Sequence, residues 1–150
     1  MTREVNRIVI HCSDSPDARD IGFHEIDQWH KERGWSGILY DGIRIHCGYH
    51  YIIRRGGVVE LGRPEDSMGA HAKGHNRDTI AICWVGKNLM DELQWESMVT
   101  LLKDICSRYL LDASDLYGHY ELDPKKTCPN IDMKELRTMM GKLLGEKTWT

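Results

Sequence analysis

A histidine and a cysteine in the last third of the chain have the types and spacing of metal ligands. His119 follows the short apolar segment Leu116-Tyr117 and Gly118, and Cys128 comes nine residues after it. The segment between them contains Pro124, so we expect it to turn back and bring an imidazole close to a sulfur. Imidazole nitrogen and thiolate sulfur are ligands that suit Zn²⁺. The simpler interpretation is a surface histidine and an incidental thiol.

His11 is the candidate third ligand. It ends the β-branched run Ile8-Val9-Ile10, so a buried strand would carry its side chain to a cleft. For His11 alone, a hydrogen-bonded core histidine is the better interpretation. Three ligands from separate elements, however, define an open tetrahedral site whose fourth position is left to a water. The ion lowers the pKa of such a water toward neutrality, so His11, His119 and Cys128 predict one Zn²⁺ per chain and hydrolytic chemistry.

Two further side chains could assist hydrolysis. Lys126 lies two residues before Cys128, so its ammonium would be tethered near the metal, where a fixed cation stabilises an oxyanion. Tyr49 follows Gly48, and its phenol could donate to a substrate oxygen or help to move a proton. The simpler interpretations are a solvated lysine and a half-buried strand tyrosine.

Other clusters of ligand-type residues are weaker candidates. The segment 46–50 reads His-Cys-Gly-Tyr-His, but alternation along a strand favours a buried, hydrogen-bonded His50. His71 and His75 are four residues apart, yet Gly74 disfavours the helix that would align them. The sequence contains no HExxH, GxSxG, GxxxxGK[ST] or GxGxxG motif.

The elements that would position these residues alternate between strands and helices. Short β-branched or apolar runs predict strands at 7–12, 79–85 and around 116–117, and the middle one is expected to be central because it does not alternate. Residues 49–54 and 58–61 flank a glycine turn and predict a hairpin.

Apolar residues at helical spacing predict three helices. Gly22 opens the first, Asp91 caps the second, and the third starts near Asp132. The third helix is expected to bury Met133, Leu136, Met140, Leu143 and Leu144. Strands alternating with helices predict an α/β fold in which helices cover a sheet.

Length and composition narrow the class of protein. A chain of 150 residues with 41% hydrophobic and 29% charged residues suits one globular domain, residues 1–150. The net charge of -3 does not favour a nucleic-acid partner. No apolar run approaches the length of a membrane span, and five irregularly spaced cysteines do not suggest a disulfide framework. The first residues lack a signal-peptide pattern, so we expect a cytoplasmic location.

Five motifs occur in a recognisable order. They are IVIHCS (8–13), WHKERGW (29–35), GYHYIIRRGG (48–57), GAHAKGHN (69–76), and GHYE (118–121) with KTCP (126–129). Between about residues 7 and 140 the chain resembles the type 2 N-acetylmuramoyl-L-alanine amidases. This family includes zinc-dependent phage lysozymes and is related to peptidoglycan recognition proteins.

The resemblance implies a single-domain α/β fold, with a central mixed β-sheet flanked by about three helices, and one catalytic zinc. At the matching positions His11, His119 and Cys128 would be zinc ligands. Tyr49 and Lys126 would be catalytic, and His71 would line the substrate groove. The implied reaction is hydrolysis of the amide between N-acetylmuramic acid and L-alanine in peptidoglycan.

Two departures from compact relatives leave questions open. Residues 38–47 form a longer connection that would border the groove, and the sequence leaves the roles of His46 and Cys47 open. The loop from His119 to Cys128 is one residue longer than in some relatives. We assign the catalytic role to Lys126 rather than Lys125 because Lys126 keeps the two-residue offset from Cys128.

Three other functions stay open at this point. The first is a module that binds muropeptides without cutting them, and the second is a cytoplasmic recycling amidase. The third is a regulatory protein with an intracellular partner. The thiolate ligand favours a lytic enzyme, an endolysin that reaches the cell wall through a membrane lesion. We expect a monomer whose partner is peptidoglycan.

Overall fold

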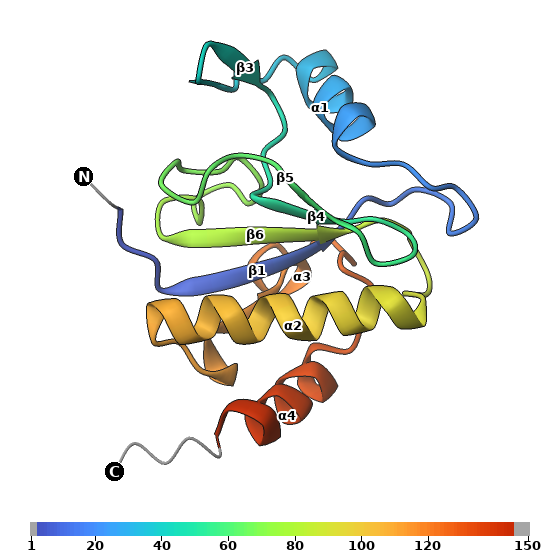
Figure 1. Cartoon of the computed structure of the whole chain (residues 1–150), viewed down its shortest axis with the longest axis vertical. Helices are drawn as coiled ribbons and strands as arrows, with labels where there is room; N and C mark the ends of the chain where they lie inside the picture. Colours follow the sequence, from blue (N-terminus) through green and yellow to red (C-terminus); the bar gives the residue numbers. More distant parts are fainter. Residues whose placement is uncertain (1–2, 146–150) are drawn as a thin grey trace.

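The computed structural model describes residues 3–145, which fold around one five-stranded sheet and a separate two-stranded hairpin (Figure 1). In chain order the elements are β1 (Arg7–Cys12), α1 (Phe23–Glu32), β2 (Ile38–Tyr40), β3 (Ile43–Ile45), β4 (Tyr51–Ile53), β5 (Val59–Leu61), β6 (Thr79–Trp84), α2 (Glu92–Tyr109), the 3-10 turn η1 (Ala113–Asp115), β7 (Leu116–Gly118), α3 (His119–Leu122) and α4 (Met133–Leu144).

The strand order explains where a site can form. The sheet runs β5-β4-β6-β1-β7, and only the β4–β5 pair is antiparallel. The predicted mixed sheet is therefore confirmed, and β6 is central, with all six of its residues buried. Because β6, β1 and β7 are parallel, their carboxyl ends meet at one edge, which is where α/β sheets usually carry their ligands.

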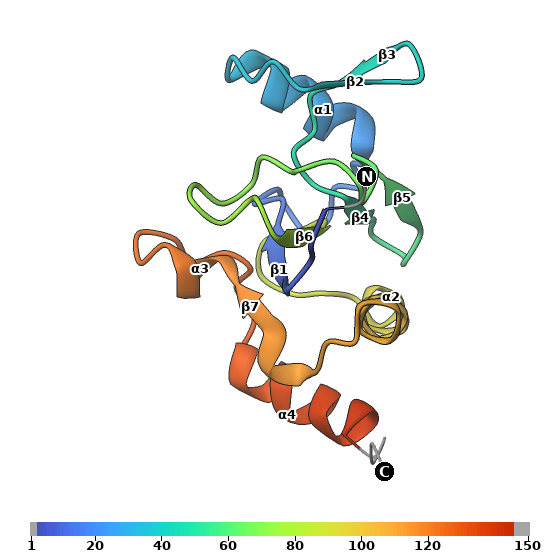
Figure 2. The same ribbon diagram turned by 90° about the vertical axis from the view of Figure 1, so that its left-hand side faces the viewer.

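The two faces of the sheet carry different layers. Seen along the strands in Figure 2, α1 and the β2–β3 hairpin lie above the sheet, whereas α2 and α4 lie below it. Ile8 and Ile10 of β1 pack into the apolar core shared with α2 and α4. Because side chains alternate along a strand, His11 points to the opposite face, where Ile26 of α1 and Ile52 of β4 belong to a second buried apolar cluster.

Local signals set most helix boundaries as predicted. Gly22 is the N-cap of α1, and Asp91 caps α2 by accepting the N–H of Gln94 at 2.8 Å. Asp132 caps α4. One expectation is wrong: Leu143 is 44% exposed because it lies on the solvent side of α4, one position from the buried Leu144.

Two short elements were not predicted from the sequence. The single turn α3 starts directly after β7, and β2 pairs with β3 within the long connection at 38–47. Asp41 and Gly42 form the two-residue turn of this hairpin, with φ of 51° and 77°. An Asp-Gly pair between apolar runs is a strong signal for such a hairpin, so the signal was present in the sequence.

Two further features concern membrane-spanning helices and disulfide bonds. Within residues 3–145, no helix has both the length and the apolar character needed to cross a bilayer. In the same part of the chain, none of the five cysteines forms a disulfide.

Strand β4 starts at Tyr51, so Tyr49 lies just before the strand rather than at its first position.

Candidate metal centre

His11 lies near the carboxyl end of β1 and its side chain is almost fully buried, with 1% exposure. It is paired in register with Cys83 of β6. The pairing of β1 with β7 ends one residue earlier, at Ile10, so β6 is the strand that fixes the position of His11 itself.

His119 is held at the junction of β7 and α3. Gly118 precedes it, and a Cβ at this glycine would lie 2.7 Å from Cγ of Met133, so only glycine lets α4 approach so closely. The N–H of Gly118 donates to Oε1 of Glu121 at 2.9 Å. Glu121 in turn forms an ion pair with Arg137 of α4 at 2.7 Å. The last helix therefore helps to orient His119.

Cys128 is positioned by hydrogen bonds at its backbone and at its sulfur. Its carbonyl accepts the N–H of Tyr120 at 2.8 Å, and the next carbonyl, of Pro129, accepts Nε1–H of Trp84 at 3.0 Å. Its Sγ accepts the N–H of Cys12 at 3.1 Å. A backbone donor aimed at sulfur stabilises a thiolate, the form that binds metal.

The structure brings together the three side chains that the sequence grouped. The ligand atoms of His11, His119 and Cys128 all lie within 4.8 Å of one another, and the two imidazole centroids are 4.5 Å apart. Among residues 3–145 this is the one such cluster of three or more His, Cys, Asp or Glu side chains. Two nitrogens and a sulfur match the donor set of an open zinc site.

The protonation of the ligands follows from their surroundings. Burial, and then the neighbouring His71 and His119, hold the pKa of His11 well below its usual value. Burial and the nearby Lys126 ammonium lower the pKa of His119. Both rings are therefore neutral near pH 7, as a metal requires. The hydrogen bond with the Cys12 thiol, together with burial, raises the pKa of Cys128, so metal binding must displace a proton from its sulfur.

Tyr49 lies beside the candidate ligands. Its ring centroid is 5.0 Å from that of His11, and burial raises its pKa well above the usual value, so the phenol keeps its proton. The preceding Gly48 is packed so tightly that a Cβ would lie 1.8 Å from the Ala70 carbonyl oxygen. Its N–H donates to Nδ1 of His30 at 2.9 Å, which anchors the segment before β4 to α1.

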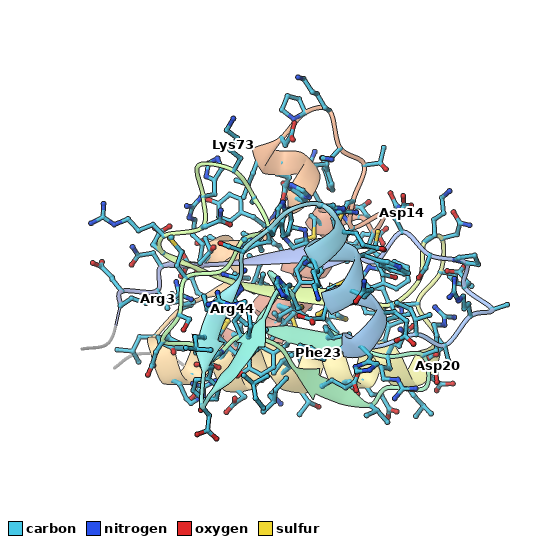
Figure 3. All side chains as sticks on the ribbon, turned by 90° about the horizontal axis from the view of Figure 1, so that it is seen from above. Arg3, Asp14, Asp20, Phe23, Arg44 and Lys73 are labelled. Carbon is cyan, nitrogen blue, oxygen red and sulfur yellow. The ribbon has the colours of Figure 1, made fainter. Side chains whose placement is uncertain are left out.

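A cavity of about 630 Å³ opens over this group. It is lined by the three candidate ligands, Tyr49 and His71, and cationic side chains surround it: Arg33, Lys73, Lys125 and Lys126. Two carboxylates, Asp14 and Asp123, also line it, and in the view from above Lys73 and Asp14 lie on either side of α3 (Figure 3). Because cations outnumber carboxylates here, the cavity favours an anionic ligand or a developing oxyanion.

Four other histidines have polar partners in the structure. His71 is buried, and its Nδ1 lies 2.8 Å from Nε2 of His11, so it contacts a candidate ligand as well as lining the cavity. His50 is buried, and its Nδ1 accepts the N–H of Ala81 at 3.0 Å, which confirms the predicted core role. Nδ1 of His46 lies 2.8 Å from the carbonyl oxygen of Trp35, and Nδ1 of His75 lies 3.4 Å from Arg7, both outside the metal cluster.

The sequence did not reveal two residues whose side chains fix the backbone of segments near the candidate site. Oδ1 of Asp27 accepts the N–H groups of His46 and Cys47 at 2.6 and 2.7 Å. Oδ1 of Asn76 accepts those of His71 and Ala72 at 2.9 and 3.0 Å. Asn side chains commonly bond nearby backbone groups in turns, so Asn76 in its glycine-containing loop was a detectable signal. Asp27 reaches a segment 19 residues away and left no such local signal.

Comparisons with known proteins agree with this architecture. The sequence matches the family described as N-acetylmuramoyl-L-alanine amidase over residues 1–131. It is 38% identical over 135 residues to an endolysin of Escherichia phage T7, covering 85% of this chain and 82% of that one. It is 32% identical over 110 residues to peptidoglycan-recognition protein SC2 of Drosophila melanogaster, covering 70% of this chain and 54% of that one. Among solved structures, the amidase LysC from Clostridium intestinale URNW superposes with a TM-score of 0.77 at 29% identity, covering 93% of this chain and 87% of that one.

Proposed function

The chain belongs to the N-acetylmuramoyl-L-alanine amidase family and hydrolyses amide bonds of peptidoglycan; on that premise we propose that it does so as a zinc-dependent endolysin. The scissile bond joins the lactyl group of N-acetylmuramic acid to L-alanine. The observation that carries the zinc proposal is the convergence of His11, His119 and Cys128 in the wall of the cavity.

The donor set fits one zinc ion per chain. Two neutral imidazoles and one thiolate would hold Zn²⁺ and leave a position open toward the cavity. When bound there, zinc supplies Lewis-acid polarisation of a water or a carbonyl oxygen. The N–H of Cys12, which donates to Sγ of Cys128, supports the charge on the sulfur.

Tyr49 acts as a hydrogen-bond donor in this proposal. Its raised pKa keeps the phenol protonated near pH 7, so it is suited to donate a hydrogen bond rather than to act as a base. Its ring lies 5.0 Å from that of His11, which supports a role in orienting the scissile amide beside the ligands.

Lys126 stabilises the oxyanion that develops on the scissile carbonyl. Its ammonium lowers the pKa values of both His11 and His119, which indicates that its positive charge acts on both rings. It is exposed, so its side chain has room to reach a bound substrate. The attraction between a cation at such a position and the carbonyl oxygen grows as negative charge develops on that oxygen in the transition state.

We further propose that residues 1–150 work as a single amidase domain and as a monomer. The substrate partner is peptidoglycan or its muropeptides. Synthesis would be cytoplasmic, and the protein would reach the cell wall through a membrane lesion, as expected for an endolysin. The endolysin of phage T7, at 38% identity, supports this assignment.

The test combines metal content with hydrolysis. Purified protein, chelator-stripped protein, stripped protein with zinc restored, and Cys128→Ser are assayed for zinc per chain and for dye release from purified cell wall. We expect about one zinc and full activity in the wild-type and restored samples, and neither in the other two. Full activity of stripped protein or of Cys128→Ser would refute the zinc mechanism.

The same assay separates the alternatives. A muropeptide-binding module would sediment with the wall and release no dye. A recycling amidase would cleave soluble muropeptides and leave the insoluble wall intact. An endolysin acts on the wall itself, and this is the outcome that we expect.

A further inference from the structure

The imidazole of His71 connects a candidate metal ligand to the protein interior. Its Nδ1 lies 2.8 Å from Nε2 of His11, and its Nε2 lies 3.0 Å from Oγ1 of Thr79, the first residue of β6. The side chain is 8% exposed. Both ring nitrogens are thus committed to protein partners, and the proposed hydrolysis assigns this ring no step.

The direction of these hydrogen bonds follows from the last acceptor in the series, the carbonyl oxygen of His75. Oγ1 of Thr79 lies 2.7 Å from the carbonyl oxygen of His75, and a carbonyl oxygen can only accept. The single hydroxyl proton of Thr79 is therefore used in that bond. Toward His71, the Thr79 oxygen must accept, so Nε2 of His71 carries a proton and donates.

The same reasoning extends to the candidate ligand. A neutral imidazole carries one N–H, so His71 with a protonated Nε2 has a bare Nδ1 that accepts. The two ring nitrogens of His71 face the ring of His11 and the hydroxyl of Thr79, and neither partner is a carboxylate that would favour a second proton on the ring. Nε2 of His11 must then donate to it across 2.8 Å, and Nδ1 of His11 keeps its lone pair.

We propose that His71 is a positioning residue that fixes His11 in the tautomer with Nε2 protonated, and thereby assigns Nδ1 of His11 as the metal-binding atom. This inference rests on the proposed function, because it gives the His11 nitrogen a metal to bind. Asn76 supports the arrangement by accepting the backbone N–H of His71 at 2.9 Å.

The choice of a histidine as the acceptor has a chemical consequence. Metal-binding histidines usually donate their second N–H to a carboxylate, a carbonyl or a water. A carboxylate would bring negative charge to the site and make the ligand more basic. A neutral imidazole orients the ring of His11 without adding charge, so the positive potential of the cavity is preserved for an oxyanion.

The first experiment replaces His71 with two amide side chains of different length. In His71→Asn, the carbonyl oxygen can occupy the place of Nδ1 and still accept from His11. In His71→Gln, the amide extends to the place of Nε2, near Thr79, and no acceptor faces His11. Zinc affinity is measured for the full chain by competition with a chromophoric chelator. We expect His71→Gln to weaken zinc binding by about 10- to 100-fold and His71→Asn to stay close to the wild type. Equal losses in both variants would overturn the proposal.

The second experiment needs no metal and no substituted His71. Long-range ¹H–¹⁵N correlations of the imidazoles in the stripped wild-type protein report the tautomers directly. We expect Nε2–H for both His11 and His71. Thr79→Val removes the hydroxyl and should let His71 lose that preference, whereas Thr79→Ser should keep it. A wild-type His11 protonated at Nδ1 would contradict the proposal even if zinc binds. Conversely, a chain that binds no zinc but shows the expected tautomers would refute the proposed function and leave the hydrogen-bond order intact.

Discussion

The two faces of the central sheet are built from the same strands and do different work. Toward α2 and α4, the side chains of β1 and β6 enter a continuous apolar core. Toward α1, the same strands present His11 and the cavity, and the apolar cluster is smaller. Alternation along β1 places a core residue directly before and directly after His11 in the sequence. The comparison teaches that packing on the opposite face of the sheet holds the backbone of the candidate metal site in place.

The largest expected effect removes a ligand from the cavity face. His119→Ala should lower wall hydrolysis by about 10³-fold or more, because it deletes a metal donor worth several kcal/mol to the transition state. The unfolding free energy of the stripped protein should change by less than about 1 kcal/mol, since His119 is only partly buried. Dye release and urea unfolding measure the two effects.

A matched control for that variant is His24→Ala, the same substitution at an exposed position of α1. It should retain both activity and stability. If His119→Ala unfolded the stripped protein as well, the separation of the two faces would be wrong.

The second-largest expected effect concerns stability, through a substitution in the apolar core between the sheet and α2. Leu102 of α2 is fully buried, so Leu102→Ala should destabilise the protein by about 2–5 kcal/mol. Urea unfolding gives the change, and kcat should hold at a temperature where the variant stays folded. A large fall in kcat under those conditions would mean that the cavity face depends on the details of core packing.

A smaller effect tests the assignment of the catalytic cation. Lys126→Ala should lower kcat by about 10²-fold, the typical loss for one oxyanion donor, with little change in zinc content. Lys125→Ala, one position earlier in the same exposed loop, should cost much less. The reverse order of the two kcat values would move the role to Lys125.

The smallest effect concerns a polar cluster that joins β4 to α2. Burial alone would raise the pKa of Glu65, but hydrogen bonds from Arg108, Tyr109 and Tyr51 outweigh it and lower the pKa to about 2. Because the folded pKa is depressed, the stabilisation is complete above the unfolded value near 4.5 and is lost as the pH falls toward 2.

The corresponding variant is Glu65→Gln. It should lower the unfolding free energy by about 1–3 kcal/mol at pH 7 and by much less at pH 2.5. Urea unfolding at both values measures the difference. A penalty that is the same at both values would show that the carboxylate charge contributes nothing.

The sequence predicted elements whose signals are local. The strands at 7–12 and 79–85 and the helix capped by Asp91 are confirmed, because β-branched runs and capping residues act within a few positions. The edge of an apolar helix face is a weaker signal, since adjacent residues lie about 100° apart around the axis. Leu143 was therefore assigned to the core although it faces solvent.

The sequence could group the candidate ligands by residue type, but not their support. The contact of His11 with His71 spans 60 residues, and that of Cys12 with Cys128 spans 116. Such pairs form only when the sheet order is known, and spacing in the sequence does not encode that order. The roles of His11, His119, Cys128, Tyr49 and Lys126 stay predictions until the variants are measured.

The ion pair between Arg137 and Glu121 sets a limit for anyone who wishes to transplant this activity. The family match ends at residue 131, before α4 begins. Yet Arg137 of that helix bonds both Glu121 and the carbonyl of Leu116, on either side of His119. A fragment that ends at residue 131 would lose these contacts of Arg137. Fusion proteins and chimaeras should therefore include α4.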